Sequence, residues 1–158
     1  MGKKSTIQSQ SEEETRQIAE QFAKTLPFKK EGALVVALSG DLGAGKTVFA
    51  QGFARGLGAL ALITSPTFLL IRHTPLSGSH FSQFVHIDCY RLEDPAELLA
   101  LGLREVLSEA GNVVLIEWAD RIRGILPADT IWVSLSYAGD QEREITIQKE
   151  AFPGIGGA

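Results

Sequence analysis

The chain has 158 residues, of which 44% are hydrophobic and 22% charged, and its formal net charge is −4 at neutral pH. This size predicts one domain with a two- or three-layer core, and no apolar run is long enough to span a bilayer. The negative charge argues against a protein that grips nucleic acid unaided, because such proteins usually carry an excess of Lys and Arg. With a single cysteine, Cys89, and no apolar leader, we expect a cytoplasmic protein.

The first part of the chain predicts a helix, a buried strand, a glycine-rich loop and a second helix, in that order. Residues 11–14, Ser-Glu-Glu-Glu, have the pattern of a capping box at the start of an amphipathic helix. The apolar run 34–39 has the length of a strand that is covered on both faces. It leads into the loop 40–47, and residues 47–57 then predict a helix with Gly58 as its C-terminal cap.

The middle of the chain predicts extended structure followed by helix. Residues 67–71 and 83–87 have the pattern of two hairpin strands, joined by the turn-rich segment 75–79. Residues 94–97, Asp-Pro-Ala-Glu, predict the start of a helical region that breaks at Gly102.

The last part of the chain predicts further strands. The apolar run 113–116 predicts a buried strand that ends at Glu117, whereas residues 131–137 and 145–147 alternate as antiparallel strands do. We therefore expect an α/β protein with a three-layer, P-loop NTPase-like fold, in which a mixed, mostly parallel central sheet carries antiparallel hairpins. We expect one domain over residues 1–150 and a flexible tail over residues 151–158.

The loop from Gly40 to Thr47, GDLGAGKT, matches the phosphate-binding pattern G-x-x-x-x-G-K-[ST]. Its small residues let successive backbone amides approach phosphate oxygens. Lys46 would reach the β and γ phosphates, and the Thr47 hydroxyl would bind Mg²⁺. The positive end of the following helix would favour the bound anion. The alternative is a glycine-rich turn that only joins a strand to a helix. The flanking strand and helix favour a nucleotide site.

Two acidic residues are candidates for the rest of the site. Glu117 follows a buried strand, where a carboxylate would support the metal beside the phosphates, unless it is a charged strand end that faces solvent. Asp88 shares one side of an extended segment with His86 and Tyr90. This arrangement indicates water positioning or metal support, or else a structural hydrogen-bond network. The hydroxyls of residues 64–67 would sense the γ phosphate or form a simple turn.

Three classes of function share these features. A small P-loop kinase would transfer the γ phosphate of ATP to a small molecule and usually has an arginine-rich lid, for which only Arg121 and Arg123 are candidates. A GTPase would ordinarily show an Asn-Lys-x-Asp segment, and the sequence contains none. The third class is a nucleotide-binding protein whose hydrolysis depends on partner proteins that close its site.

An ordered set of motifs resembles the bacterial TsaE family, formerly called YjeE. The motifs are GDLGAGKT, TSPTF (64–68), HIDCYRLEDPAE (86–97), IEWAD (116–120) and LP (126–127), and the match extends from SEEET (11–15) to GDQEREI (139–145). The resemblance implies a weak ATPase needed to form N6-threonylcarbamoyladenosine at position 37 of tRNAs that read codons beginning with A. It implies TsaD and TsaB as partners, contact with tRNA only through that complex, and no membrane association. ATP hydrolysis would support repeated turnover of the complex.

The resemblance also implies roles for individual residues. Catalytic roles fall on Asp88, Lys46 and Glu117, and Mg²⁺ ligation falls on Thr47 and Glu117. The ATP-binding set is Asp41, Leu42, Gly43, Ala44, Gly45, Lys46, Thr47, Val48 and Ser11. Trp118 matches a tryptophan near the site, although it could equally be a packed aromatic residue. Val48 departs from the family, which often has a second threonine there, so a side-chain hydroxyl is lost while the backbone amide can still donate.

Overall fold

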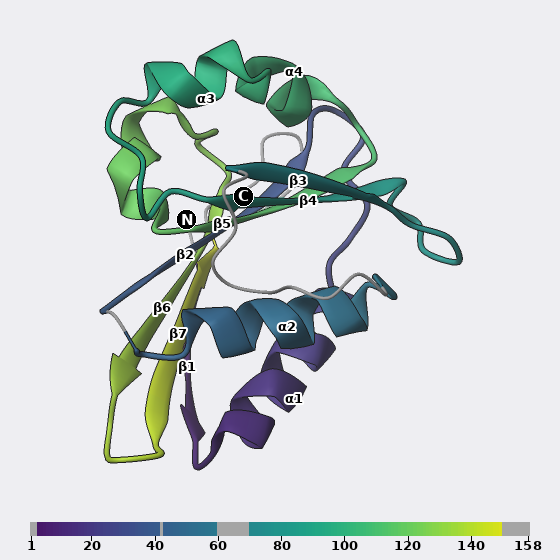
Figure 1. Ribbon diagram of the computed structural model, residues 1–158. Coiled ribbons are helices and arrows are strands. Elements are labelled where there is room, and N and C mark those ends of the chain that lie inside the picture. Colours follow the sequence, from purple (N-terminus) through teal and green to yellow (C-terminus); the bar gives the residue numbers. More distant parts are fainter. Residues whose placement is uncertain (1–2, 42, 60–69, 150–158) are drawn as a thin grey trace.

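The computed structural model describes residues 3–41, 43–59 and 70–149, shown in colour in Figure 1. Its strands are β1 (Lys3–Ser9), β2 (Leu34–Gly40), β3 (Ile71–Pro75), β4 (Gln83–Asp88), β5 (Asn112–Glu117), β6 (Ile131–Tyr137) and β7 (Arg143–Lys149). Its helices are α1 (Glu12–Lys24), α2 (Lys46–Gly56), α3 (Ala96–Ala100), α4 (Leu103–Ser108) and the 3₁₀ helix η1 (Ala119–Ile125).

The described strands form one sheet in the order β1-β7-β6-β2-β5-β4-β3. The four central strands, β6, β2, β5 and β4, are mutually parallel. The strands β3 and β7 run antiparallel to their neighbours, and β1 is antiparallel to β7. Five of these seven strands therefore point in the same direction, which confirms the predicted mixed, mostly parallel sheet. The register places Leu38 of β2 beside Glu117 of β5, so the carboxyl ends of these two strands meet.

Helices cover both faces of the sheet (Figure 1). On one face α1 and α2 pack with the apolar side chains of Phe22, Phe49 and Phe53, whose rings lie 6.1 to 6.5 Å apart. On the other face α3, α4 and η1 contribute a second cluster that includes Leu103 and Ile122. The three-layer arrangement is therefore confirmed. Within the described ranges, no helix has both the length and the apolar character needed to cross a membrane.

The helices α1 and α2 approach each other unusually closely. A Cβ atom placed on Gly52 would lie 2.1 Å from the carbonyl oxygen of Arg16, and one on Gly56 would lie 2.4 Å from that of Glu20. Two glycines one helical turn apart therefore let the backbones of the two helices touch. Arg16 also donates to Gln51 Oε1 of α2, at 3.3 Å from Nε and 3.2 Å from Nη2. This contact fixes α1 beside the middle of α2.

The predicted helix ends agree with the structure. Ser11 caps α1, since its Oγ accepts a hydrogen bond of 3.1 Å from the Glu14 N–H. Gly58 follows α2 with φ of 77°, and Gly102 separates α3 from α4 with φ of 95°. Both angles lie in the left-handed region, where glycine is favoured because it has no Cβ.

The sequence analysis missed one strand and ended another too early. It predicted no element before Ser11, but β1 pairs with β7 along its whole length. Most side chains of β1 are polar and exposed, so its local pattern carries little strand signal. The first hairpin strand was predicted at 67–71, yet β3 runs from Ile71 to Pro75. Pro75 is tolerated there because β3 is an edge strand. Residues 67–69 and the expected tail 151–158 lie outside the described residues.

Candidate functional site

The loop between β2 and α2 owes its shape to its glycines. Gly43 and Gly45 have φ of 81° and 104°, which residues with a side chain rarely adopt. A Cβ atom on Gly43 would also lie 2.5 Å from the Tyr137 hydroxyl oxygen. Gly45 is the N-cap of α2, and it has no side chain to accept a bond from the first amides of that helix. These N–H groups, at the positive end of the helix, form a ready site for an anion.

Lys46 is held inside this loop. Its ammonium group donates to the carbonyl oxygens of Gly40 and Asp41, at 2.5 and 2.7 Å, and lies 4.0 Å from the centre of the Trp118 ring. The residue is only 5% exposed. Burial lowers the pKa of Lys46, and the nearby carboxylates of Glu117 and Asp41 oppose that shift. The loop therefore concentrates a positive charge where a phosphate group would lie.

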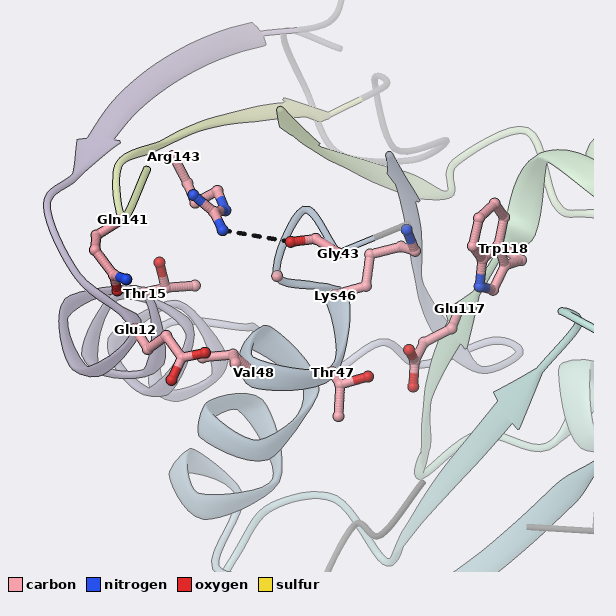
Figure 2. A pocket seen from close by; sticks show the side chains of 11 residues that line it. Glu12, Thr15, Gly43, Lys46, Thr47, Val48, Glu117, Trp118, Gln141 and Arg143 are labelled. Atoms are coloured by element: carbon pink, nitrogen blue, oxygen red, sulfur yellow. Dashed lines mark hydrogen bonds between the residues drawn. The ribbon is translucent and has the colours of Figure 1, made fainter. Parts of the chain in front are cut away.

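A pocket of about 220 Å³ opens beside the loop, as Figure 2 shows. Its walls come from the start of α1, the loop and first turn of α2, the end of β5, and the β6–β7 hairpin. The lining residues are Glu12, Thr15, Gly43, Gly45, Lys46, Thr47, Val48, Glu117, Trp118, Gln141 and Arg143. In Figure 2 the Thr47 hydroxyl and the Glu117 carboxylate point toward one another. The pocket thus combines an anion site with two oxygen ligands suited to a hard cation.

The two predicted carboxylates end neighbouring strands. Asp88 of β4 pairs in register with Glu117 of β5. Glu117 is buried, and its Oε2 lies 2.7 Å from Nε2 of His86. Burial raises the pKa of Asp88; the hydrogen bond from the Tyr90 N–H opposes this shift, and the Glu117 charge adds to it. The sheet therefore brings Asp88, His86 and Glu117 together.

Cys89, the residue after Asp88, is not available for chemistry. Its side chain is fully buried, and burial, reinforced by the Asp88 charge, raises the pKa of the thiol to about 12. The thiol therefore stays protonated at neutral pH, and nucleophilic or redox chemistry would need the thiolate.

Trp118 has the only positive φ among the described residues other than glycine, 58°. This left-handed conformation is uncommon for a bulky side chain. It turns the chain sharply from β5 into η1 and places the indole ring in the wall of the pocket. The ring also packs against Tyr90, with 5.2 Å between ring centres. Trp118 is therefore both a packed aromatic residue and a part of the site.

The structure gathers most of the predicted site residues. Gly43, Gly45, Lys46, Thr47, Val48 and Glu117 line the pocket. Ala44 is fully buried, and Asp41 lies in the exposed part of the loop. Leu42 and the hydroxyl segment 64–67 lie outside the described residues. Ser11 is not among the lining residues, and its hydroxyl caps α1, although Glu12 and Thr15 of that helix do line the pocket. Asp88 is not a lining residue either; it pairs with Glu117 at the end of the neighbouring strand.

The sequence analysis missed the contribution of the β6–β7 hairpin. Arg143 lines the pocket and donates from Nη2 to the Gly43 carbonyl at 3.4 Å (Figure 2). Its guanidinium carbon lies 4.5 Å from the centre of the Tyr137 ring. Gln141 of the same hairpin and Glu12 and Thr15 of α1 also line it. These residues are far from the loop in sequence and have no motif of their own. The similarity of segments 11–15 and 139–145 to the family was the signal that pointed to them.

The arginines considered for a kinase lid make other contacts. Arg121 donates from Nη1 to the Leu92 carbonyl at 3.3 Å, and the guanidinium carbon of Arg123 lies 3.8 Å from the Trp132 ring centre. Neither residue lines the pocket. Neither of these two arginines is therefore placed as a lid over the described pocket.

The chemistry of the site fits Mg²⁺ held jointly with a nucleotide. Among the described residues, no group of three or more His, Cys, Asp or Glu side chains is arranged to hold a metal ion. Magnesium is usually bound by one or two protein oxygens together with substrate phosphates and water. Thr47 and Glu117 would supply two such oxygens beside the anion site of the loop.

A glycine-rich loop between a buried parallel strand and a helix, with a buried lysine and a carboxylate at the next strand end, defines a P-loop-like α/β protein. The family model for the threonylcarbamoyl adenosine biosynthesis protein TsaE matches residues 9–145. The chain belongs to the TsaE family, as its motifs predicted.

Individual relatives agree with this assignment. The tRNA threonylcarbamoyladenosine biosynthesis protein TsaE of Bacillus subtilis is 44% identical over 134 residues, covering 85% of this chain and 78% of that protein. The TsaE protein of Rickettsia bellii is 42% identical over 143 residues, covering 89% and 92%. The crystal structure of YdiB from Bacillus subtilis matches with a TM-score of 0.73 and 36% identity, covering 96% of this chain and 88% of that one. This structural match confirms the predicted fold class.

Proposed function

We propose that this chain is a cytoplasmic, Mg²⁺-dependent ATPase that supports the formation of N6-threonylcarbamoyladenosine at position 37 of tRNAs reading codons that begin with A. It would act with TsaD and TsaB and would meet tRNA through that complex. Membership of the TsaE family supports the role in this tRNA modification. The net charge of −4 agrees with a protein that leaves RNA binding to its partners.

One observation carries the proposal of ATP binding: the Lys46 ammonium, the Thr47 hydroxyl and the Glu117 carboxylate line the same pocket. The ammonium now bonds to two carbonyl oxygens of its own loop. Phosphate oxygens are stronger acceptors than carbonyls, because their hydrogen bonds with an ammonium are charge-assisted at both ends. Nucleotide phosphates would therefore replace these carbonyls as the partners of Lys46.

The other residues of the site suit hydrolysis. When bound, Mg²⁺ would neutralise negative charge on the phosphates. Asp88, whose pKa is raised mainly by burial, would be a better proton acceptor than an ordinary aspartate and would orient the attacking water. It pairs with Glu117 in the sheet but does not line the pocket, so full activity would need closure of the site by a partner.

The test is reconstitution of tRNA modification with purified TsaB, TsaD and this chain. We expect several rounds of modification per complex with this chain and ATP. Without the chain, we expect a single round of modification or much slower turnover. We expect the same result when a non-hydrolysable ATP analogue is added to the complete mixture, which still contains the ATP that the pathway uses. Equal turnover with and without the chain would contradict the proposed role.

A variant of Asp88 separates binding from hydrolysis. We expect Asp88→Ala to keep its affinity for ATP and to lose hydrolysis by at least about 100-fold, the usual contribution of a positioned acid or base. Isothermal titration measures the affinity, and phosphate release in the presence of TsaB and TsaD measures the hydrolysis. The control is Glu109→Ala, which removes an exposed carboxylate after α4. Normal hydrolysis by the Asp88 variant would remove this residue from the catalytic set.

A further inference from the structure

His86 of β4 lies directly behind the Glu117 carboxylate. In the parallel pairing of β4 with β5, His86 is opposite Leu115 and Asp88 is opposite Glu117. Phe84 and Leu115 belong to the core under α1 and α2, so side chains at alternate positions from them face the same side of the sheet. His86 and Glu117 therefore share the face on which α2 begins.

The contacts of His86 fix both its own ring and the carboxylate. The ring stacks on Phe84 at 6.2 Å between ring centres with an angle of 26° between planes. Nε2 lies 2.7 Å from Oε2 of Glu117, and the two side chains are only 14% and 7% exposed. Because carboxylate oxygens only accept hydrogen bonds, Nε2 carries the proton and donates it. His86 is not among the residues that line the pocket, so it holds Glu117 from the protein side.

This hydrogen bond leaves the other carboxylate oxygen for a cation. A carboxylate has two oxygens and about four acceptor positions, and His86 uses one position on Oε2. A glutamate side chain has three rotatable bonds, and a metal such as Mg²⁺ demands a near-ideal geometry of its ligands. Groups that hydrogen-bond to metal ligands fix the orientation of those ligands, and their loss typically weakens metal binding about 10- to 100-fold.

We propose that His86 is a positioning residue, which holds the Glu117 carboxylate in the orientation that binds the divalent cation of a nucleotide complex. The inference rests on the proposed function, because it takes Glu117 as a ligand of that cation. His86 touches neither the nucleotide nor the cation and acts through Glu117.

Two variants that both carry a side-chain amide, His86→Gln and His86→Asn, test the inference. His86→Gln places an amide N–H near the position of Nε2, whereas the side chain of His86→Asn is one methylene shorter and cannot reach Glu117. The probe is Mn²⁺, added with a non-hydrolysable ATP analogue, and free Mn²⁺ is measured by electron paramagnetic resonance. We expect His86→Asn to weaken Mn²⁺ binding about 10- to 100-fold, and His86→Gln to stay close to wild type. Affinity for the analogue in EDTA should be unchanged in both.

The matched control is His80→Asn, which removes a histidine whose Nε2 lies 2.9 Å from the Leu26 carbonyl. It should bind Mn²⁺ as the wild type does. If His86→Asn fails to fold, as judged by circular dichroism, His86→Phe keeps a ring against Phe84 and removes the donor.

The outcomes distinguish this inference from the proposed function. If folded His86→Asn or His86→Phe binds Mn²⁺ with the affinity of the wild type, although neither can donate to Glu117, the positioning role alone is overturned. Equal weakening in His86→Gln and His86→Asn would overturn it too, because the role would then depend on the ring and not on the hydrogen bond. A wild-type protein that binds the analogue but no Mn²⁺ would overturn both proposals.

Discussion

Replacement of Lys46 by methionine is expected to weaken ATP binding at least about 100-fold. The ammonium is a charged side-chain donor buried in the phosphate loop, and each hydrogen bond between charged groups contributes about 1.5–3 kcal/mol. Methionine keeps a similar volume, so the contact with Trp118 can remain apolar. Isothermal titration of ATP into the wild type and the variant measures the change.

The same variant should also change thermal stability, because Lys46 makes two hydrogen bonds within its own loop when no ligand is bound. The variant leaves the carbonyls of Gly40 and Asp41 without their ammonium partner, so thermal unfolding without nucleotide should also shift. The control is Lys24→Met on α1, where the lysine is half-exposed and forms an ion pair with Glu20. Unchanged ATP affinity in the Lys46 variant, with wild-type affinity in the control, would remove this lysine from the nucleotide site.

Replacement of Gly52 by alanine is expected to destabilise the protein by at least about 2 kcal/mol. The added Cβ would lie 2.1 Å from the Arg16 carbonyl oxygen, so α1 and α2 must move apart. Overpacking of this kind typically costs about 1–3 kcal/mol, and occasionally more where backbone must move. The cost exceeds the gain of about 1 kcal/mol that alanine brings to an exposed helix position.

Urea denaturation of the Gly52 variant, followed by circular dichroism, gives the free energy of unfolding. The matched control is Gly124→Ala in η1, because a Cβ atom there meets no other atom within 4 Å. That variant should stay within about 0.5 kcal/mol of the wild type. A Gly52 variant as stable as the control would mean that the two helices can separate without loss.

The parts of the fold that the sequence predicted are those with strong local signals. The run 34–39 and the run 113–116 are continuous apolar segments of strand length, and both are buried strands in the structure. Helix α1 has a capping residue, an acidic first turn and an apolar face, which together mark its start. The loop motif then identified Lys46 and Thr47, and the strand end identified Glu117, because P-loop chemistry needs these residue types at fixed spacing.

The rest depends on contacts between distant segments. The strand β1 forms because β7 offers a free edge, and a polar seven-residue segment gives little sign of that pairing. Arg143 reaches the loop because β6 and β7 fold back across it, a contact between residues 100 positions apart. The left-handed conformation of Trp118, at the β5–η1 connection, has no signature in the sequence.

The edge strand β1 covers the hydrogen-bonding groups on one side of β7. If the first nine residues were removed, β7 would present an open row of amide and carbonyl groups to solvent. Such rows recruit strands from other molecules, so a shortened chain would be prone to self-association. The hairpin arm that carries Arg143 would lose its outer support at the same time, since Ser9 pairs with Arg143 in the register of β1 and β7. A tag fused close to Lys3 would lie next to the same β1–β7 pairing, in which Lys3 is opposite Lys149.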